Sequence, residues 1–190
     1  YHFVDLEKRA EDCGSVRELM ELYKQTLDYF MGLQVETEHI NDEIHIQQDI
    51  NAFRSSLVYD CIERAMDLVE GGSVYSADGG PTAGTISAGD SLAALDEIVF
   101  NQKLLTMEQV LHAMSTNYED METVPAGPEI RAILLNKAPK FGNDDERADK
   151  WVVELEDYIG SSYRYKYRSS KYGKGPVPCC YSYSQSPVTG

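Results

Sequence analysis

The sequence predicts a helix-rich α/β protein with two short strands, and three observations carry this expectation. Apolar residues recur at helical spacing over several stretches, two of which open with a capping box. The segment 71–89 is instead rich in glycine, serine, threonine and alanine. Residues 178–185 alternate as strand residues do. Strands are therefore expected at Ser73–Ser76 and Cys179–Gln185.

Helices are expected along most of the remaining chain. The first begins with a capping box formed by Ser15 and Glu18, whose side chains satisfy free backbone amides. Gly32 is expected to end this helix, because glycine is favoured just after a helix. Thr106 and Gln109 form a second capping box. The expected helices cover residues 15–31, 33–51, 57–69, 88–100, 106–115 and 129–137, with a last helix after Asp144 or Asp145.

The last helix has a pronounced amphipathic pattern. The short side-chain oxygen of Asp144 or Asp145 is expected to cap its first turn, where backbone amides lack partners. The cluster 143–145 is therefore expected to be structural. The apolar face of this helix is expected to comprise Ala148, Trp151, Val152, Leu155 and Ile159.

Composition and charge exclude two classes of partner. The net charge of −15 argues against DNA or another nucleic acid as ligand. No apolar run approaches the ~20 residues of a membrane helix, so a soluble, cytoplasmic protein without a membrane partner is expected. The chain opens at Tyr1 without a methionine, and both ends are expected to continue in a longer polypeptide.

The cysteines and histidines are more simply interpreted as free thiols and as residues of a solvated helix than as redox or metal sites. The four cysteines match neither a zinc pattern nor a compact disulfide framework, and free thiols are expected at Cys13, Cys61, Cys179 and Cys180. His39 and His45 do not share a helix face, so a solvated helix is favoured over a metal site. No metal ligand is assigned.

Two other segments have features of binding sites. The glycine-rich segment precedes a helix, as phosphate loops do, but it lacks the Gly-Lys-Ser/Thr ending of such loops. Close packing of this segment is favoured. Residues 163–168 interleave tyrosine with arginine and lysine, as single-strand binders do. The acidic remainder of the chain favours a surface contact within a larger enzyme.

Four short motifs follow one another between residues 60 and 145. They are Asp-Cys-Ile at 60–62, Gly-Gly-Ser-Val-Tyr at 71–75, Asp-Ser-Leu-Ala-Ala-Leu at 90–95 and Pro-Lys-Phe-Gly-Asn-Asp-Asp at 139–145. In this order they resemble the large catalytic domain of glycyl radical enzymes, the pyruvate formate-lyase-like family. The resemblance covers nearly all of residues 50–190. Ser76 departs from it, because many members carry asparagine there.

The resemblance implies an α/β barrel of ten strands, of which this chain is a helix-rich part. In that family one loop carries a cysteine that becomes a thiyl radical, in a Gly-Cys-Val-Glu context. Another carries the radical glycine, in an Arg-Val-x-Gly-Tyr context. Neither motif occurs in this sequence. Residues 1–190 are thus expected to be a fragment of the catalytic barrel domain without the thiyl-cysteine loop and the glycyl radical domain, and no catalytic residue is assigned.

The same resemblance implies an enzyme. The parent protein is expected to be an anaerobic lyase, namely a dehydratase, a decarboxylase or a C–C, C–N or C–S lyase that acts on a small organic substrate. The isolated chain is expected to be inactive. The glycyl radical is expected to be installed by an activating enzyme that uses S-adenosylmethionine and an iron–sulfur cluster, in a full-length homodimer. The alternative is a non-catalytic structural or binding module derived from that fold.

Substrate contacts are expected from the glycine-rich segment and the C-terminal strand. Both supply small, hydroxylic or aromatic groups that suit a cavity closed to water. The residues alone leave open which face of the strand points inward, and the resemblance favours the tyrosine face. The residues expected to contact the substrate are Tyr75, Ser87, Tyr181, Tyr183 and Gln185. These residues do not distinguish between a diol, an amino alcohol, a hydroxyproline, a sulfonate and an arylacetate as the substrate.

Overall fold

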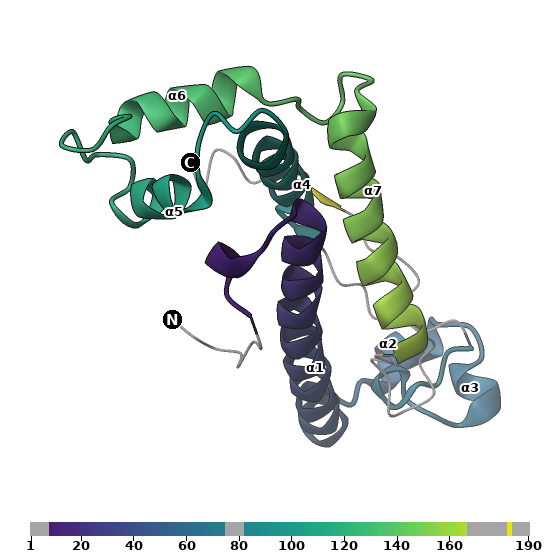
Figure 1. Ribbon diagram of the computed structural model, residues 1–190. Coiled ribbons are helices and arrows are strands. Elements are labelled where there is room, and N and C mark those ends of the chain that lie inside the picture. The colour runs from purple at the N-terminus through teal and green to yellow at the C-terminus, as the bar shows by residue number, and fades with distance from the viewer. Residues whose placement is uncertain (1–7, 75–81, 167–181, 184–190) are drawn as a thin grey trace. The chain divides into compact units, whose positions relative to one another are not determined.

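The computed structural model describes residues 8–74, 82–166 and 182–183, and helices dominate these ranges (Figure 1). Short 3-10 helices cover Ala10–Asp12 and Leu68–Glu70, and π-helical turns cover Asp96–Asn101 after α4 and Ser162–Lys166 after α7. Within the described ranges, no helix combines the length and the apolar character needed to cross a membrane. The α-helices are α1 Val16–Gln48, α2 Ala52–Ser56, α3 Cys61–Arg64, α4 Thr85–Leu95, α5 Met107–Ser115, α6 Gly127–Lys137 and α7 Glu146–Ser161.

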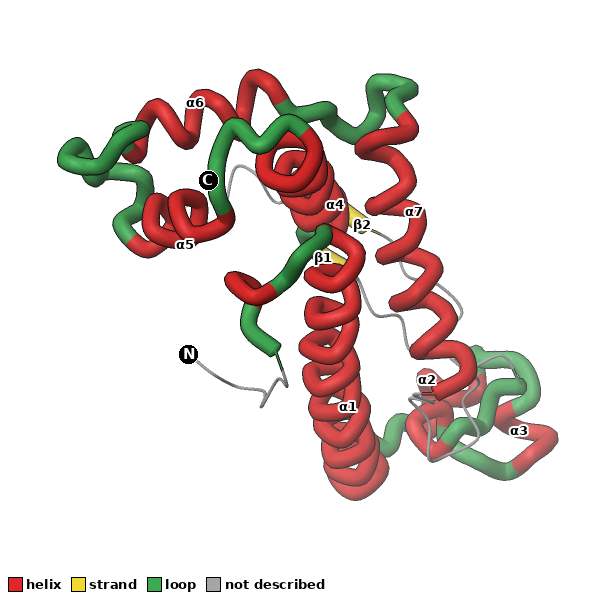
Figure 2. The backbone as a smooth tube through the Cα atoms, viewed as in Figure 1, coloured by secondary structure: helices red, strands yellow, loops and turns green. Residues whose placement is uncertain are grey.

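Two short strands, β1 Thr82–Ala83 and β2 Ser182–Tyr183, pair in one small sheet (Figure 2). β2 lies within the predicted strand 179–185, whose other residues are outside the described ranges. The strand predicted at Ser73–Ser76 is wrong at Ser73 and Val74, which form a bend, while residues 75 and 76 are not described. The described part of the chain is therefore helix-rich with a small sheet, and a ten-stranded barrel is not visible in it.

The chain divides into two compact units, and the division falls within α1 and α7. The first unit comprises residues 1–26, 83–156 and 182–190, and the second comprises 27–82 and 157–181. In the first unit, the π-helical turn after α4 packs with α5 and α6. The buried residues of this apolar core are Ile98, Val99, Leu105, Val110, Ala113 and Ile130.

Local sequence features explain where α5 and α6 begin. Thr106 Oγ1 accepts from the Gln109 amide at 3.1 Å, and Gln109 Oε1 accepts from the Thr106 amide at 2.8 Å, which confirms the predicted capping box of α5. α6 starts at Gly127 and carries Pro128 in its first turn, where the missing amide hydrogen is not needed. The α1 box is only half formed, because Ser15 Oγ accepts from Glu18 whereas the Glu18 side chain accepts from the Gly14 amide.

α7 confirms the predicted amphipathic face. Ala148, Trp151, Val152 and Leu155 are buried residues of the first unit, and Ile159 is a buried residue of the second. On the polar side of α7, Glu154 accepts hydrogen bonds from Lys24 and Arg17 of α1. Burial alone would raise the pKa of Glu154, but these two cations lower it below its usual value.

In the second unit, the prediction that Gly32 ends the first helix is wrong. α1 runs without a break to Gln48, so the helices predicted over 15–31 and 33–51 are one. Met31 and Val35 lie on either side of the glycine and are buried in a cluster with Ile159 and Tyr163. This packing outweighs the roughly 1 kcal/mol by which glycine disfavours a helix interior.

The helix predicted over 57–69 is also wrong. Asp60 and Ala65 adopt left-handed φ angles of 72° and 50°, which no continuous α-helix admits, so α3 is limited to one turn. After Ala65 the chain folds back, and the Met66 amide donates to the Cys61 carbonyl at 3.1 Å. The apolar spacing that suggested one long helix belongs to separate turns.

Candidate functional site

The Gly71–Gly72 pair forms a turn in the second unit where the backbone approaches itself closely. Gly71 has a φ of 82°, a left-handed value that favours glycine. A Cβ added to Gly72 would lie 2.4 Å from the Met66 carbonyl oxygen and 2.8 Å from that of Asp67. Arg64 Nη1 donates to the carbonyl oxygens of both glycines at 3.1 Å. Backbone contacts and a guanidinium therefore fix this turn.

The same turn brings two of the sequence motifs together. Cys61 belongs to the Asp-Cys-Ile motif, and its Sγ would be 2.9 Å from a Cβ on Gly72. The thiol is free and buried, so it fills the space that the glycine leaves. The chain continues from here toward Tyr75, which lies outside the described ranges.

Asp67 is the polar centre of this region. Its buried carboxylate accepts from the Asn51 amide at 3.0 Å, from Ser55 Oγ at 2.8 Å and from the Val69 amide at 3.1 Å. Burial alone would raise the pKa of Asp67, but these hydrogen bonds outweigh it and hold the pKa below its usual value. The Asp67 amide in turn donates to Glu70, which completes a capping box. Sequence reasoning missed this residue, although Asp67 and Glu70 have capping-box spacing.

The other two motifs meet in the first unit. Asp90 Oδ1, on α4, accepts from the Phe141 amide at 2.8 Å. At the neighbouring position, a Cβ on Gly89 would lie 2.3 Å from Cγ2 of Val152, so α4 and α7 touch at this glycine. The Asp-Ser-Leu motif and the Pro-Lys-Phe-Gly-Asn-Asp-Asp motif are thus parts of one joint.

The turn after Phe141 sets the start of α7. The Gly142 amide, at a φ of 85°, donates to Asp149 Oδ1 at 3.1 Å. Asp145 Oδ1 accepts from the Arg147 amide at 3.1 Å, which confirms the predicted cap. Hydrogen bonds from the Arg147 side chain and amide hold the pKa of Asp145 below its usual value. The hydrogen bonds described for this turn are internal and structural.

Two of the predicted substrate-binding residues lie within the described ranges. Ser87 is exposed on α4, and its carbonyl oxygen accepts from Ser91 Oγ at 2.7 Å. Tyr183 belongs to β2, which pairs with β1, and only Gly84 separates β1 from α4. Their role in substrate binding stays a prediction. The other predicted residues are outside the described ranges, namely Tyr75, Tyr181 and Gln185.

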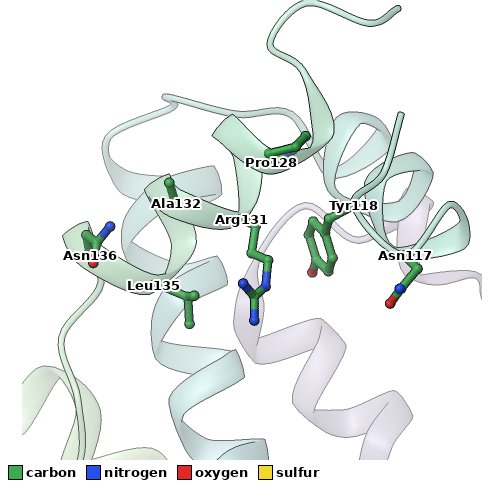
Figure 3. Close-up of a pocket in the computed structure, with 7 residues that line it drawn as sticks. All are labelled: Asn117, Tyr118, Pro128, Arg131, Ala132, Leu135 and Asn136. Atoms are coloured by element: carbon green, nitrogen blue, oxygen red, sulfur yellow. The ribbon is translucent and has the colours of Figure 1, made fainter. Parts of the chain in front are cut away.

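A surface pocket of about 650 Å³ lies in the first unit between α6 and the segment that joins α5 to α6 (Figure 3). Figure 3 shows Arg131 and Tyr118 beside each other at this pocket. Ser87 does not line it. Sequence reasoning did not anticipate it, because its wall depends on left-handed φ angles at Asn117 and Tyr118. The lining residues are Asn117, Tyr118, Pro128, Arg131, Ala132, Leu135 and Asn136.

A larger groove of about 930 Å³ lies along α1 and α4 in the first unit. Leu22 and Leu92 are buried members of its lining, and Tyr23 is partly exposed there. Burial raises the pKa of the Tyr23 phenol, which keeps it neutral at physiological pH. The mainly apolar lining of the groove suits packing rather than proton transfer.

The remaining candidates for metal or thiol chemistry are histidines and cysteines. Across residues 8–74, 82–166 and 182–183, no group of three or more His, Cys, Asp or Glu side chains is placed to hold a metal ion. Cys13 is free and buried, and burial raises the pKa of its thiol. Cys179 and Cys180 lie outside the described ranges, and His39 and His45 belong to α1.

Comparison with known proteins identifies the family. The family model described as pyruvate formate lyase-like matches residues 4–190. The chain belongs to this family. The two joints described above are therefore places where the family's sequence motifs contact each other.

Several relatives match most of the chain but only part of their own length. The probable dehydratase YbiW of Escherichia coli is 30% identical over 169 residues, which are 88% of this chain and 20% of that protein. The trans-4-hydroxy-L-proline dehydratase of Clostridioides difficile is 34% identical over 143 residues, or 74% and 17%. The 4-hydroxyphenylacetate decarboxylase glycyl radical subunit of the same species is 25% identical over 194 residues, or 94% and 21%. The chain thus spans about a fifth of these relatives.

The fold agrees with that of a solved relative. A structure on 1,2-propanediol dehydration in Roseburia inulinivorans superposes with a TM-score of 0.80 and 28% sequence identity. The superposition covers 92% of this chain and 21% of that one. The chain therefore adopts the fold of one segment of a much longer polypeptide.

Proposed function

We propose that the full-length protein is a glycyl radical lyase and that this chain forms part of its substrate-cavity barrel. The observation that carries the proposal is the match of nearly the whole chain to a family whose named relatives include dehydratases and a glycyl radical decarboxylase subunit. A ten-stranded barrel gives β1 and β2 a larger sheet to join, since a two-stranded sheet of this length is not stable by itself.

Within that enzyme, the residues of this chain position the substrate and exclude water. Tyr75 follows the Gly71–Gly72 turn in the sequence, and it is assigned a contact with the substrate. Tyr183 offers a ring as an apolar wall and a hydroxyl as a hydrogen-bond partner for a hydroxyl or carboxylate of the substrate. Ser87, Tyr181 and Gln185 add further polar contacts. The substrate is a small diol, amino alcohol, hydroxyproline, sulfonate or arylacetate.

The radical chemistry depends on residues outside this chain. A glycyl radical, installed by an activating enzyme with S-adenosylmethionine and an iron–sulfur cluster, would supply hydrogen abstraction in the parent protein. The isolated chain is inactive on this proposal, and the full-length protein is a cytoplasmic homodimer. No acid, base or hydrogen-transfer role is assigned to residues 1–190.

Substitution of Tyr183 in the activated full-length enzyme tests the proposal. Tyr183→Phe removes one hydrogen bond, and we expect kcat/KM to fall about tenfold without loss of folding. Tyr183→Ala also removes the ring and should reduce turnover further. Steady-state kinetics with a panel of the five substrate classes, together with thermal melting, gives both results. Wild-type turnover and substrate affinity in both variants would place Tyr183 outside the cavity.

A further inference from the structure

The pocket between α6 and the segment before it combines one cation with apolar walls. Its volume of about 650 Å³ lies within the range of roughly 300–1,000 Å³ that is typical of small-molecule sites. Figure 3 shows Arg131 and Leu135 extending from α6 toward the same side as Tyr118. The α6 residues that line the pocket have the three- and four-residue spacing of one helical face, so the helix presents them together. They are Pro128, Arg131, Ala132, Leu135 and Asn136.

Asn117 and Tyr118 form the opposite wall, and their backbone has an unusual shape. Both have left-handed φ angles, 52° at Asn117 and 60° at Tyr118, which are uncommon for residues other than glycine and cluster at functional sites. The Tyr118 amide donates to the Ala113 carbonyl oxygen at 2.6 Å. A Cβ on Gly127 would lie 2.6 Å from the Tyr118 carbonyl oxygen, so the start of α6 packs directly on this wall. These contacts preform the pocket, which lowers the conformational cost of binding a ligand.

The acidic residues that follow Tyr118 are engaged with other side chains. Glu119 Oε1 accepts from Asn117 Nδ2 at 3.0 Å, and Asp120 Oδ2 lies 2.7 Å from His112 Nε2. Across residues 8–74, 82–166 and 182–183, no carboxylate pairs with the Arg131 guanidinium, and Arg131 is exposed. The guanidinium is therefore accessible to a ligand that enters the pocket.

We propose that this pocket binds a small monocarboxylate with an apolar body, whose carboxylate contacts Arg131 and whose body lies against Tyr118 and Leu135. A guanidinium matches a carboxylate through two parallel hydrogen bonds. Arg131 is the one cation among the lining residues, and the net charge of −15 disfavours an anion of higher charge such as phosphate. The Tyr118 ring packs against the apolar core of the first unit and gives the ligand a fixed, flat contact.

Titration calorimetry of the full-length protein, without activation of the radical, tests this inference. The probe is benzoate, which combines a carboxylate with a flat apolar ring. Benzamide, which has nearly the same shape without the charge, and inorganic phosphate are the control ligands. Arg131→Gln removes the cation, Arg131→Lys keeps the charge but not the planar fork, and Leu135→Ala shortens the apolar wall. Lys137→Gln is the matched control, because Lys137 is an exposed cation of the same helix that does not line the pocket.

We expect benzoate to bind with a Kd on the order of 1 mM, since one charged contact and one small ring contribute. Benzamide binding to the unaltered protein and benzoate binding to Arg131→Gln should each be at least about tenfold weaker. Arg131→Lys should give an intermediate Kd, Leu135→Ala a Kd raised roughly threefold, and Lys137→Gln no change. In hydrogen-exchange mass spectrometry, benzoate should protect peptides that cover residues 117–136.

Benzoate binding that is unchanged in Arg131→Gln would overturn the proposal, because the ligand would then occupy another site. Benzamide that binds as tightly as benzoate, phosphate that binds more tightly, or no detectable binding of benzoate would overturn it as well. The inference goes beyond the proposed function, and none of these outcomes depends on turnover. A failure of the Tyr183 test and a failure here are therefore distinguishable.

Discussion

The four motifs meet in pairs at two places, called joints here, and at each joint a glycine allows a close approach of a different kind. In the first unit, Gly89 lets α4 approach Val152 within a region that buries apolar residues; a Cβ there would lie nearest to the side-chain atom Cγ2 at 2.3 Å, with the backbone nitrogen and Cα of Val152 at 3.1 Å and 3.2 Å. In the second unit, Gly72 lets the chain approach two backbone carbonyl oxygens and the Cys61 thiol, around a buried carboxylate. A side chain can move or be shortened, whereas a carbonyl oxygen held by the fold cannot. The two joints therefore differ in how much change they tolerate.

Loss of apolar packing in the first unit should give the largest effect. Leu155 on α7 is fully buried, so Leu155→Ala should lower the free energy of unfolding by about 2–5 kcal/mol through lost contacts and a cavity. Val153→Ala is the matched control, because Val153 lies on the same helix with 55% of its surface exposed. Urea unfolding followed by circular dichroism measures both. Equal losses would show that α7 is not anchored by this face.

Gly72→Ala should have the next largest effect. It should lower the free energy of unfolding by about 3 kcal/mol, because the added methyl group would be forced against backbone atoms. Gly89→Ala should lose less, since alanine favours a helix interior by roughly 1 kcal/mol and the Val152 side chain is the nearest obstacle. Adding Val152→Ala should relieve the closest contact of the Gly89 variant and leave the 3.1 Å and 3.2 Å contacts with the Val152 backbone, whereas adding Cys61→Ala should not rescue the Gly72 variant. Hydrogen exchange within each unit measures these effects. Rescue by Cys61→Ala would contradict the backbone explanation.

Replacing the Asp67 carboxylate should weaken the second unit by about 2 kcal/mol at neutral pH, because an amide nitrogen would face hydrogen-bond donors in Asp67→Asn. The folded-state pKa of Asp67 is lowered, so its stabilising contribution is present above the unfolded-state pKa of about 4 and is lost as the pH falls through the folded value.

Unfolding experiments from pH 7 to pH 2 check this. Asp67→Asn should flatten the acid dependence of the second unit and leave unchanged that of the first unit, where Glu18 is a carboxyl with a lowered pKa. An unchanged acid profile would show that Asp67 is not the group that titrates.

The smallest effect is expected at Asp90. Asp90→Ala removes the acceptor for the Phe141 amide and should cost about 1 kcal/mol, while Asp90→Asn keeps an acceptor oxygen and should cost less. Thermal melting of the two variants, with hydrogen exchange at the Phe141 amide, measures the difference. Equal losses in the two variants would show that the hydrogen bond does not hold the joint.

The sequence predicted those helices whose signals are local. α5 was expected from a capping box, and α7 from a capping aspartate and an apolar face; each of these features involves residues within a few positions of one another. The pairing of the four motifs was not predicted. Asp90 and Phe141 are distant in sequence, and no periodicity reports their contact.

By itself, the sequence therefore determined the caps of α5 and α7, the buried face of α7 and the family, because these depend on neighbouring residues or on short motifs. Tertiary structure alone decided that α1 continues through Gly32, since the compensating contacts of Met31 and Val35 come from Ile159 and Tyr163 at the other end of the chain. It also decided that the region after α2 breaks into short turns. There the Asp67 carboxylate accepts hydrogen bonds from the Asn51 amide and the Ser55 hydroxyl. Leaving a buried carboxylate without hydrogen bonds would cost more free energy than interrupting one regular helix.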